Sequence, residues 1–181
     1  VTTLRIKNEA NSGILIHKVD TSGEGIYGVK FLLYDEDRNP IGEFTSDDDG
    51  YVYITADDLP DGANTSGRFY LRELEAAEGY ILDKEYKTVY VRPGRTAEIE
   101  WVNEAITGQI QIYKYAAEAN SVTGVPAGTP LQGAVYEIIN ERSGRVVDYI
   151  TTDARGVAAS KPLPLTRYKI REVTAPAYFQ L

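Results

Sequence analysis

The sequence predicts an all-β chain that forms tandem β-sandwich domains, the second of which is truncated. Short runs rich in Val, Ile, Tyr, Phe and Thr alternate with Gly, Asp, Asn and Pro, a pattern typical of strands joined by turns. The sequence contains no convincing amphipathic run of helix length. At 181 residues the chain is long enough for one to two domains, and most of the pattern recurs about one domain later. Antiparallel sandwiches are the expected architecture.

An internal repeat divides the chain into two similar copies. The matching segments are 28–34 with 133–139, 45–50 with 151–156, and 59–60 with 163–164. A fixed period of this kind indicates tandem units that share a fold. We therefore expect a complete domain over residues 11–105 and a second domain over residues 106–181 that lacks its C-terminal strands.

The first ten residues belong to neither copy. Residues 4–10 match residues 99–105, and Asn8 precedes Asn103 by 95 residues, which is about one period. We expect residues 1–10 to be the last strand of a preceding repeat or a linker. The chain is then a window from a longer array, with the next acceptor asparagine roughly 20 residues beyond Leu181.

Three polar residues of the first copy, Lys18, Glu73 and Asn103, lie on the apolar side of strand-like alternations. Side chains alternate between the two faces of a strand, so residues two apart share a face. The apolar residues that share these faces are Ile14 and Ile16, Phe69 and Leu71, and Ile99 and Trp101. We therefore expect all three polar side chains to point into the core. These residue types, buried together, indicate self-crosslinking through an amide bond.

The second copy repeats most of this pattern. Lys114 follows Ile110 and Ile112 on one face, and Glu172 follows Tyr168 and Ile170 in the same way. No acceptor follows before the chain ends. Lys114 and Asn8 are therefore candidate crosslinking residues that have no partner in their own copy.

The motifs that carry these residues resemble a known family. Residues 14–18, 70–80 and 99–103 are similar to the B-type repeat of collagen-binding adhesins, which also occurs in Gram-positive pilins. That family has Lys on the first strand, Glu in an E-x-x-A-P-x-G-Y segment, and Asn or Asp on the last strand. The chain departs from the pattern at Ala77, where proline is usual, and at Ala177-Tyr178, where glycine is missing before the tyrosine.

The resemblance implies a prealbumin-like, Ig-like sandwich whose first and last strands are neighbours, with Lys18 against Asn103 and Glu73 nearby. Burial disfavours both charged forms, so it lowers the pKa of lysine and raises that of glutamate. A neutral amine attacks the carboxamide while a protonated Glu73 donates to the carboxamide oxygen and relays protons. Glu172 has the same catalytic role in the second copy. Ammonia leaves once per molecule. We therefore expect self-crosslinking in a single turnover and not an enzyme that processes a separate substrate.

The resemblance also predicts a structural function. A Lys18–Asn103 isopeptide bond suits a stalk or shaft segment of an adhesin or pilin, extracellular and anchored to the cell wall through a segment outside this chain. The expected partners are neighbouring repeats of the same chain, other pilin subunits or a host matrix protein. The net charge of −8 argues against nucleic acid and anionic membranes as partners, and no apolar run approaches membrane-spanning length. We expect no cofactor.

Alternative interpretations stay open. The 14 tyrosines could line the groove of a ligand-binding adhesin module that recognises a host protein or glycan. A hydrolase with paired carboxylates would need an inward acidic partner for Glu73, for which Glu75 is the candidate. The simplest reading is an ordinary Lys–Glu ion pair with the ammonium in water.

Other motifs carry weaker signals. The Asp47-Asp-Asp-Gly50 segment lacks the remaining positions of a calcium loop and predicts a hairpin turn. Residues 163–167 approximate a sortase signal but have Arg167 in place of glycine. The single histidine, His17, and the absence of cysteine leave no zinc site and no disulfide, so we expect no metal.

Overall fold

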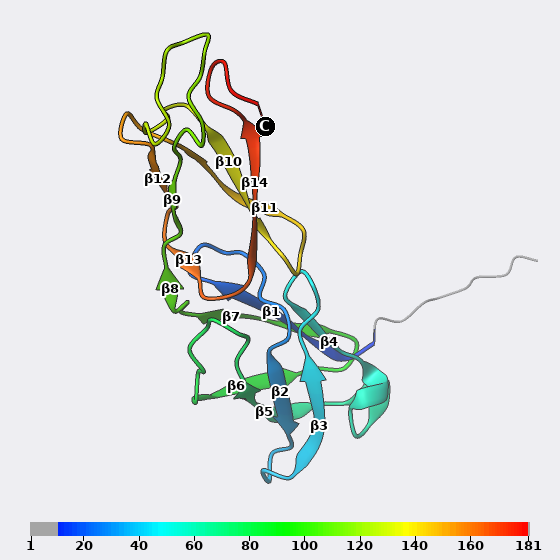
Figure 1. Ribbon diagram of the computed structural model, residues 1–181. Helices are drawn as coiled ribbons and strands as arrows, with labels where there is room; N and C mark the ends of the chain where they lie inside the picture. Colours follow the sequence, from blue (N-terminus) through cyan, green and yellow to red (C-terminus); the bar gives the residue numbers. More distant parts are fainter. Residues whose placement is uncertain (1–10, 181) are drawn as a thin grey trace, which may run out of the picture. The chain divides into compact units, whose positions relative to one another are not determined.

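The computed structural model describes residues 11–180, which divide into two compact units (Figure 1). The first unit ends at Ala105 and the second begins at Ile106. Strands dominate both units, and the helices of the described residues are two short 3-10 turns, η1 (Ala56–Asp58) and η2 (Gly62–Asn64). The predicted all-β class is confirmed.

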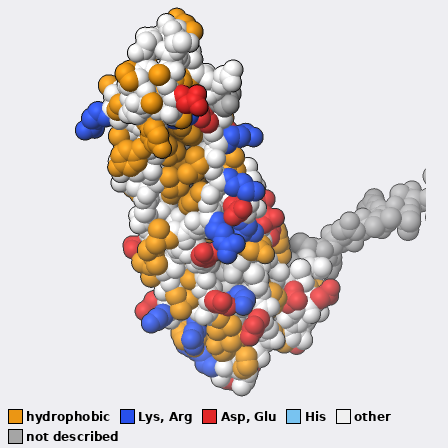
Figure 2. All heavy atoms as spheres, viewed as in Figure 1, with side chains coloured by type: hydrophobic (Ala, Val, Ile, Leu, Met, Phe, Trp, Pro, Cys, Tyr) orange, Lys and Arg blue, Asp and Glu red, His pale blue; other side chains and the backbone are white. Residues whose placement is uncertain are grey.

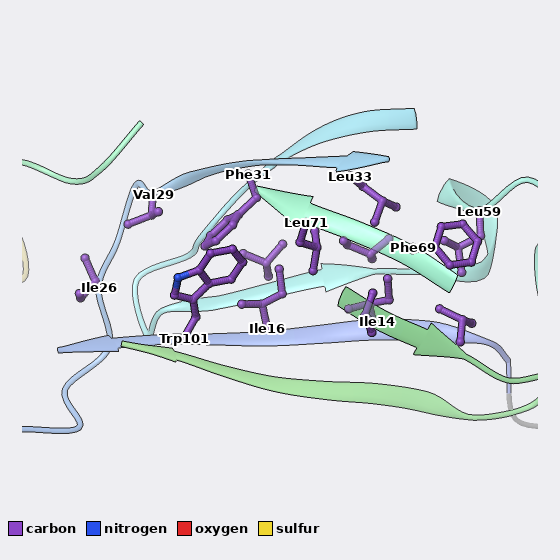
Figure 3. Packing of buried hydrophobic residues seen from close by; sticks show 14 residues of the cluster. Ile14, Ile16, Ile26, Val29, Phe31, Leu33, Leu59, Phe69, Leu71 and Trp101 are labelled. Atoms are coloured by element: carbon purple, nitrogen blue, oxygen red, sulfur yellow. The ribbon is translucent and has the colours of Figure 1, made fainter. Parts of the chain in front are cut away.

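Two sheets form the first unit. One sheet has the strand order β4-β1-β7, and the other has the order β3-β2-β5-β6. The strands are β1 (Gly13–Asp20), β2 (Lys30–Tyr34), β3 (Pro40–Thr45), β4 (Tyr51–Ile54), β5 (Gly67–Glu75), β6 (Tyr86–Val91) and β7 (Thr96–Asn103). Figure 3 shows buried side chains of both sheets pointing toward one another, among them Ile16, Phe31, Leu71 and Trp101. The unit is therefore a β-sandwich with a single apolar core.

The strands β1 and β7 pair in parallel, from Gly13 opposite Thr96 to Asp20 opposite Asn103. The chain therefore enters and leaves this unit on adjacent strands, as the family resemblance implies. All other ladders of the unit are antiparallel. Because parallel neighbours need a long crossover, almost the whole unit lies between these two strands in sequence.

The turn at Asp47–Gly50 corrects one expectation. The Asp47 carboxylate accepts hydrogen bonds from the backbone N–H groups of Asp49 and Tyr51, at 3.0 and 2.8 Å, which closes a tight turn. The strands on either side, β3 and β4, belong to different sheets, so the turn is not a hairpin. It instead carries the chain from one layer of the sandwich to the other.

The second unit repeats this design with smaller sheets. Its strands are β8 (Thr107–Gly108), β9 (Gln111–Tyr113), β10 (Val135–Asn140), β11 (Val146–Thr151), β12 (Val157–Ala159), β13 (Leu163–Pro164) and β14 (Tyr168–Thr174). They form a sheet of order β11-β10-β14 and the pairs β12-β9 and β13-β8. A small core gathers around Ala134, Ile138 and Ile150.

The predicted inward face of β14 is only partly buried. Tyr168 and Glu172 are half-buried, but Ile170 is 46% exposed. The other strands described in this unit form only the two-stranded pairs β12-β9 and β13-β8, whereas the sheet β4-β1-β7 of the first unit has three strands. Hydrophobic side chains gather on the viewed surface of the second unit (Figure 2).

Candidate crosslinking site

Lys18, Glu73 and Asn103 converge in the core of the first unit, where their exposed fractions are 0, 0 and 2%. The amide nitrogen Nδ2 of Asn103 donates to both carboxyl oxygens of Glu73, at 2.8 and 3.0 Å. The Lys18 Nζ lies 3.9 Å from Glu73 Oε1. The three residues come from β1, β5 and β7, so both sheets contribute to the cluster.

Strand geometry explains this convergence. The alternation that buries Ile14 and Ile16 also buries Lys18, two residues further along β1. In the parallel ladder Lys18 lies opposite Trp101, and its Nζ donates to the Trp101 carbonyl oxygen at 2.9 Å. Trp101 packs against Phe31 with ring centroids 5.1 Å apart. The lysine amine is thus fully buried, with polar contacts to the Trp101 carbonyl and Glu73 and apolar side chains around them.

Burial pushes both ionisable groups toward their neutral forms. Desolvation lowers the pKa of Lys18 from 10.5 to about 8, although the Glu73 charge opposes this shift. Desolvation likewise raises the pKa of Glu73, against hydrogen bonds from Asn103 and the Asp83 backbone and the charge of Lys18. The two shifts narrow the difference between the pKa of Lys18 and that of Glu73, which favours transfer of a proton from the ammonium to the carboxylate.

The orientation of the carboxamide differs from the expected one. The prediction had a protonated Glu73 donating to the carboxamide oxygen, but here the NH₂ group faces Glu73, and Asn103 Oδ1 is buried without a hydrogen-bond partner. An ionised carboxylate only accepts, so it attracts the donor end of the amide. Glu73 consequently lies between the lysine amine and the nitrogen that would leave as ammonia.

Three further contacts surround the cluster and were not predicted from the sequence. The backbone N–H of Asp83 donates to Glu73 Oε2 at 2.6 Å. The Asp83 carboxylate accepts a hydrogen bond from the Trp101 indole at 2.8 Å. The Lys87 Nζ lies 4.5 Å from the centre of the Trp101 ring. Asp83 carried no signal in the repeat, because the second copy was matched only as far as the segment before it.

A glycine turn supports the lysine in each copy. Gly50 accepts a hydrogen bond from the Lys18 backbone N–H, and Gly156 accepts the equivalent bond from Lys114, both at 2.7 Å. Each glycine has a positive φ, and a Cβ added to it would lie 2.2 or 2.3 Å from the carbonyl oxygen of its lysine. The repeat alignment contained this signal, since it matched the segments that end at these two glycines.

The second copy brings two of its predicted residues together. Lys114 Nζ lies 2.9 Å from Glu172 Oε2, with exposed fractions of 23 and 19%. The hydrogen bond to Glu172 raises the pKa of Lys114, opposite to the direction at Lys18. Glu172 Oε1 is buried without a partner. Asn8 lies outside the described residues, so the structure assembles all three residue types only in the first copy.

The remaining candidates lie elsewhere. Glu75, the suggested hydrolase partner, is 63% exposed and pairs with Lys30 at the surface. His17 stacks on Tyr51 with ring centroids 4.2 Å apart. A surface hollow of about 460 Å³ lies at the start of β1 and does not include Glu73. Exposed tyrosines are spread over β4, β6, β9 and β11.

Residues 11–180 hold no group of three or more His, Asp or Glu side chains placed to bind a metal ion. None of the helices described has the length and hydrophobicity that a membrane span requires.

The fold and the buried cluster define a tandem prealbumin-like β-sandwich protein. The model of the family described as the SpaA prealbumin-like fold domain matches residues 12–105 and 109–181, and the chain belongs to this family. The predicted family resemblance and tandem fold are thereby confirmed. No curated protein matches the sequence significantly.

Solved structures similar to this chain include two pilins. The Bacillus anthracis TIE protein is 29% identical over 93% of this chain, with a TM-score of 0.47. A streptococcal ancillary pilin is 20% identical over 94% of this chain and 56% of its own length, with a TM-score of 0.46. BcpA, the major pilin subunit of Bacillus cereus, is 11% identical over 92% of this chain and 88% of its own, also with a TM-score of 0.46. The chain spans 29% of the length of the TIE protein.

Proposed function

We propose that this chain is a structural stalk or shaft segment of a Gram-positive surface adhesin or pilin, and that its first unit crosslinks Lys18 to Asn103. The observation that carries the proposal is the buried Lys18–Glu73–Asn103 cluster between the first and last strands of the unit. Membership of the SpaA prealbumin-like family supports the structural role. The self-crosslinking occurs once per molecule, so the chain is not a turnover enzyme.

The proposed reaction exchanges one amide for another. The Lys18 ammonium gives a proton to Glu73, and the neutral Nζ attacks Cγ of Asn103. Glu73 then gives its proton to Nδ2, with which it already shares hydrogen bonds of 2.8 and 3.0 Å, and ammonia leaves. The Nζ–Cγ bond forms, the Cγ–Nδ2 bond breaks, and the second amine proton returns to Glu73. Fixed proximity supplies an effective molarity that can reach about 10⁵ M.

The strand arrangement gives this bond a mechanical purpose. Tension that enters at Gly13 and leaves at Asn103 pulls the parallel strands β1 and β7 past each other, because these residues lie at opposite ends of the ladder. A covalent link between Lys18 and Asn103 carries that tension directly from one strand to the next. The rest of the sandwich, 85 residues of chain, is then bypassed.

Other parts of the proposal follow from this function. A tension-bearing segment is expected outside the cell and anchored to the cell wall. Its partners would be neighbouring repeats of the same chain or other pilin subunits. The domains are proposed to span residues 11–105 and 106–181. In the second, Glu172 would act as Glu73 does once a strand with a suitable acceptor pairs with β9, beside Lys114.

Single-molecule stretching from the two ends tests the mechanical role. The first unit of the wild type should release almost no chain, whereas Lys18→Ala should add an unfolding step of roughly 290 Å, at about 3.4 Å for each of the 85 residues. Lys30→Ala, at an exposed position, is the control and should behave as the wild type. Equal extension of the wild type and Lys18→Ala would contradict the proposal.

A further inference from the structure

We infer that Asp83 is a positioning residue for the crosslinking reaction, which holds the Glu73 carboxyl group in register with strand β7. This inference rests on the function proposed above and adds to it a residue outside the lysine, glutamate and asparagine set. Asp83 lies between β5 and β6, ten residues after Glu73, and is half-buried.

Asp83 connects the two halves of the site through different atoms. Its backbone N–H donates to Glu73 Oε2 at 2.6 Å, and its carboxylate Oδ2 accepts from Trp101 Nε1 at 2.8 Å. The same Trp101 binds the Lys18 amine through its carbonyl oxygen, at 2.9 Å. Asn103 follows two residues later on the same face of β7. Asp83 thereby fixes the Glu73 carboxyl group relative to β7. This strand carries both the carbonyl oxygen that accepts from the Lys18 amine and the Asn103 carboxamide.

These contacts also assign separate tasks to the Glu73 oxygens. Oε2 is held by the Asp83 N–H, and this leaves Oε1 as the oxygen that faces Lys18, at 3.9 Å from Nζ. Both oxygens contact Asn103 Nδ2. Rotation of the carboxyl group would break the Asp83 hydrogen bond, so the route from Nζ through Oε1 to the leaving nitrogen stays aligned.

The charges around the site affect the reaction in a defined direction. The Asp83 carboxylate raises the pKa of both Glu73 and Lys18, while the Lys87 ammonium lowers the pKa of Lys18. The reactive pair holds one proton between Lys18 and Glu73, so the rate falls at acidic and at basic pH. Removal of the Asp83 charge should shift both limbs of the pH–rate profile to lower pH, and removal of the Lys87 charge should shift the basic limb to higher pH.

The test uses the whole chain, made in a short pulse of cell-free synthesis. The crosslinking reaction is then followed at pH values between 5 and 9, by the loss of ammonia in the intact mass. Asp83→Ala removes the acceptors of the Trp101 indole and of the Glu85 N–H, and it should slow the reaction about 10- to 100-fold, the range expected for a small misplacement. Asp83→Asn keeps one oxygen for the indole but gives up the hydrogen bond that the other carboxylate oxygen accepts from the Glu85 N–H at 2.9 Å. It should therefore react faster than Asp83→Ala, with both pH limbs displaced from those of the wild type. Glu85→Gln, an exposed change in the same connection, is the control.

The outcomes separate this inference from the proposed function. A wild type that never loses ammonia overturns the crosslink itself. If the wild type crosslinks, and Asp83→Asn and Asp83→Ala have the same rate and the same pH limbs as the wild type, only the role of Asp83 is overturned. If Trp101 fluorescence shows that Asp83→Ala is unfolded, the pH profile of Asp83→Asn decides, because a purely structural role would leave both limbs in place.

Discussion

Replacement of Glu73 by glutamine separates the chemistry of the site from its packing. Glutamine has nearly the same shape and still offers an oxygen to the Asp83 N–H, but it cannot take a proton from Lys18. We expect Glu73→Gln to fold without the amide bond. Its matched control is Glu75→Gln, the same change two residues along β5, where the exposed pair with Lys30 contributes little.

The expected loss of stability follows from the chain that the bond closes. Lys18 and Asn103 are 85 residues apart, and a crosslink over that length stabilises by about 4.5 kcal/mol in the chain-entropy model. Glu73→Gln should therefore unfold with a free energy lower by about this amount. The crosslinked chain keeps a closed loop when unfolded, so the uncrosslinked variant should also show a larger denaturant m-value. A mere packing defect would not raise m.

Denaturant unfolding followed by tryptophan fluorescence measures both quantities. Trp101 is the only tryptophan and is fully buried beside the site, so its signal reports on the first unit alone. Intact mass of the same samples shows which variants have lost ammonia. The reasoning fails if Glu73→Gln loses ammonia like the wild type, or if it unfolds at the same midpoint and with the same m-value as Glu75→Gln.

Three further predictions use other parts of the structure. Asn103→Ala cannot crosslink, so its Lys18 keeps a free amine whose pKa is about 8 in the folded chain and 10.5 in the unfolded one. The unfolded chain then binds more protons between these pH values, and this residue should raise the stability by up to about 3 kcal/mol across that window in urea titrations. The crosslinked wild type should lack this rise. Gly50→Ala should destabilise the first unit by more than about 2 kcal/mol, because its Cβ would meet the Lys18 carbonyl. Gly23→Ala, at a similar φ but with open space around it, should cost about 1 kcal/mol. Equal losses of stability in thermal melts would refute this explanation. Glu172→Gln should leave the mass deficit at one ammonia, and a change in that deficit would show that the second copy reacts.

Strand alternation predicted the inward direction of the three site residues well. Residues 14–18, 69–73 and 99–103 each lie within one strand, and the polar residue at the end of each segment is buried. This worked because both sheets of the first unit are covered on their inner faces, so the period of two follows burial. On β14 the same alternation overestimated the burial of Ile170, in a unit where the described strands outside its own sheet form only two-stranded pairs.

Contacts made through irregular backbone could not be predicted from the sequence. Asp83 reaches Glu73 through its N–H and not through its side chain, and a backbone donor leaves no trace in residue identity. The orientation of the Asn103 carboxamide depends on the protonation of its neighbour, which is a property of the assembled core. The change of sheet after Asp47–Gly50 was hidden for a similar reason, because a tight turn looks the same between paired strands and between layers.

The intact mass of the purified chain, measured beside Lys18→Ala, tests the proposed crosslink most directly. A bond between Lys18 and Asn103 predicts a wild-type mass about 17 Da below that of the sequence, the mass of the ammonia lost when the amine replaces the amide nitrogen. Lys18→Ala should show the full mass of its own sequence. A wild type with its full mass would contradict the crosslink and leave Lys18, Glu73 and Asn103 as a buried polar cluster.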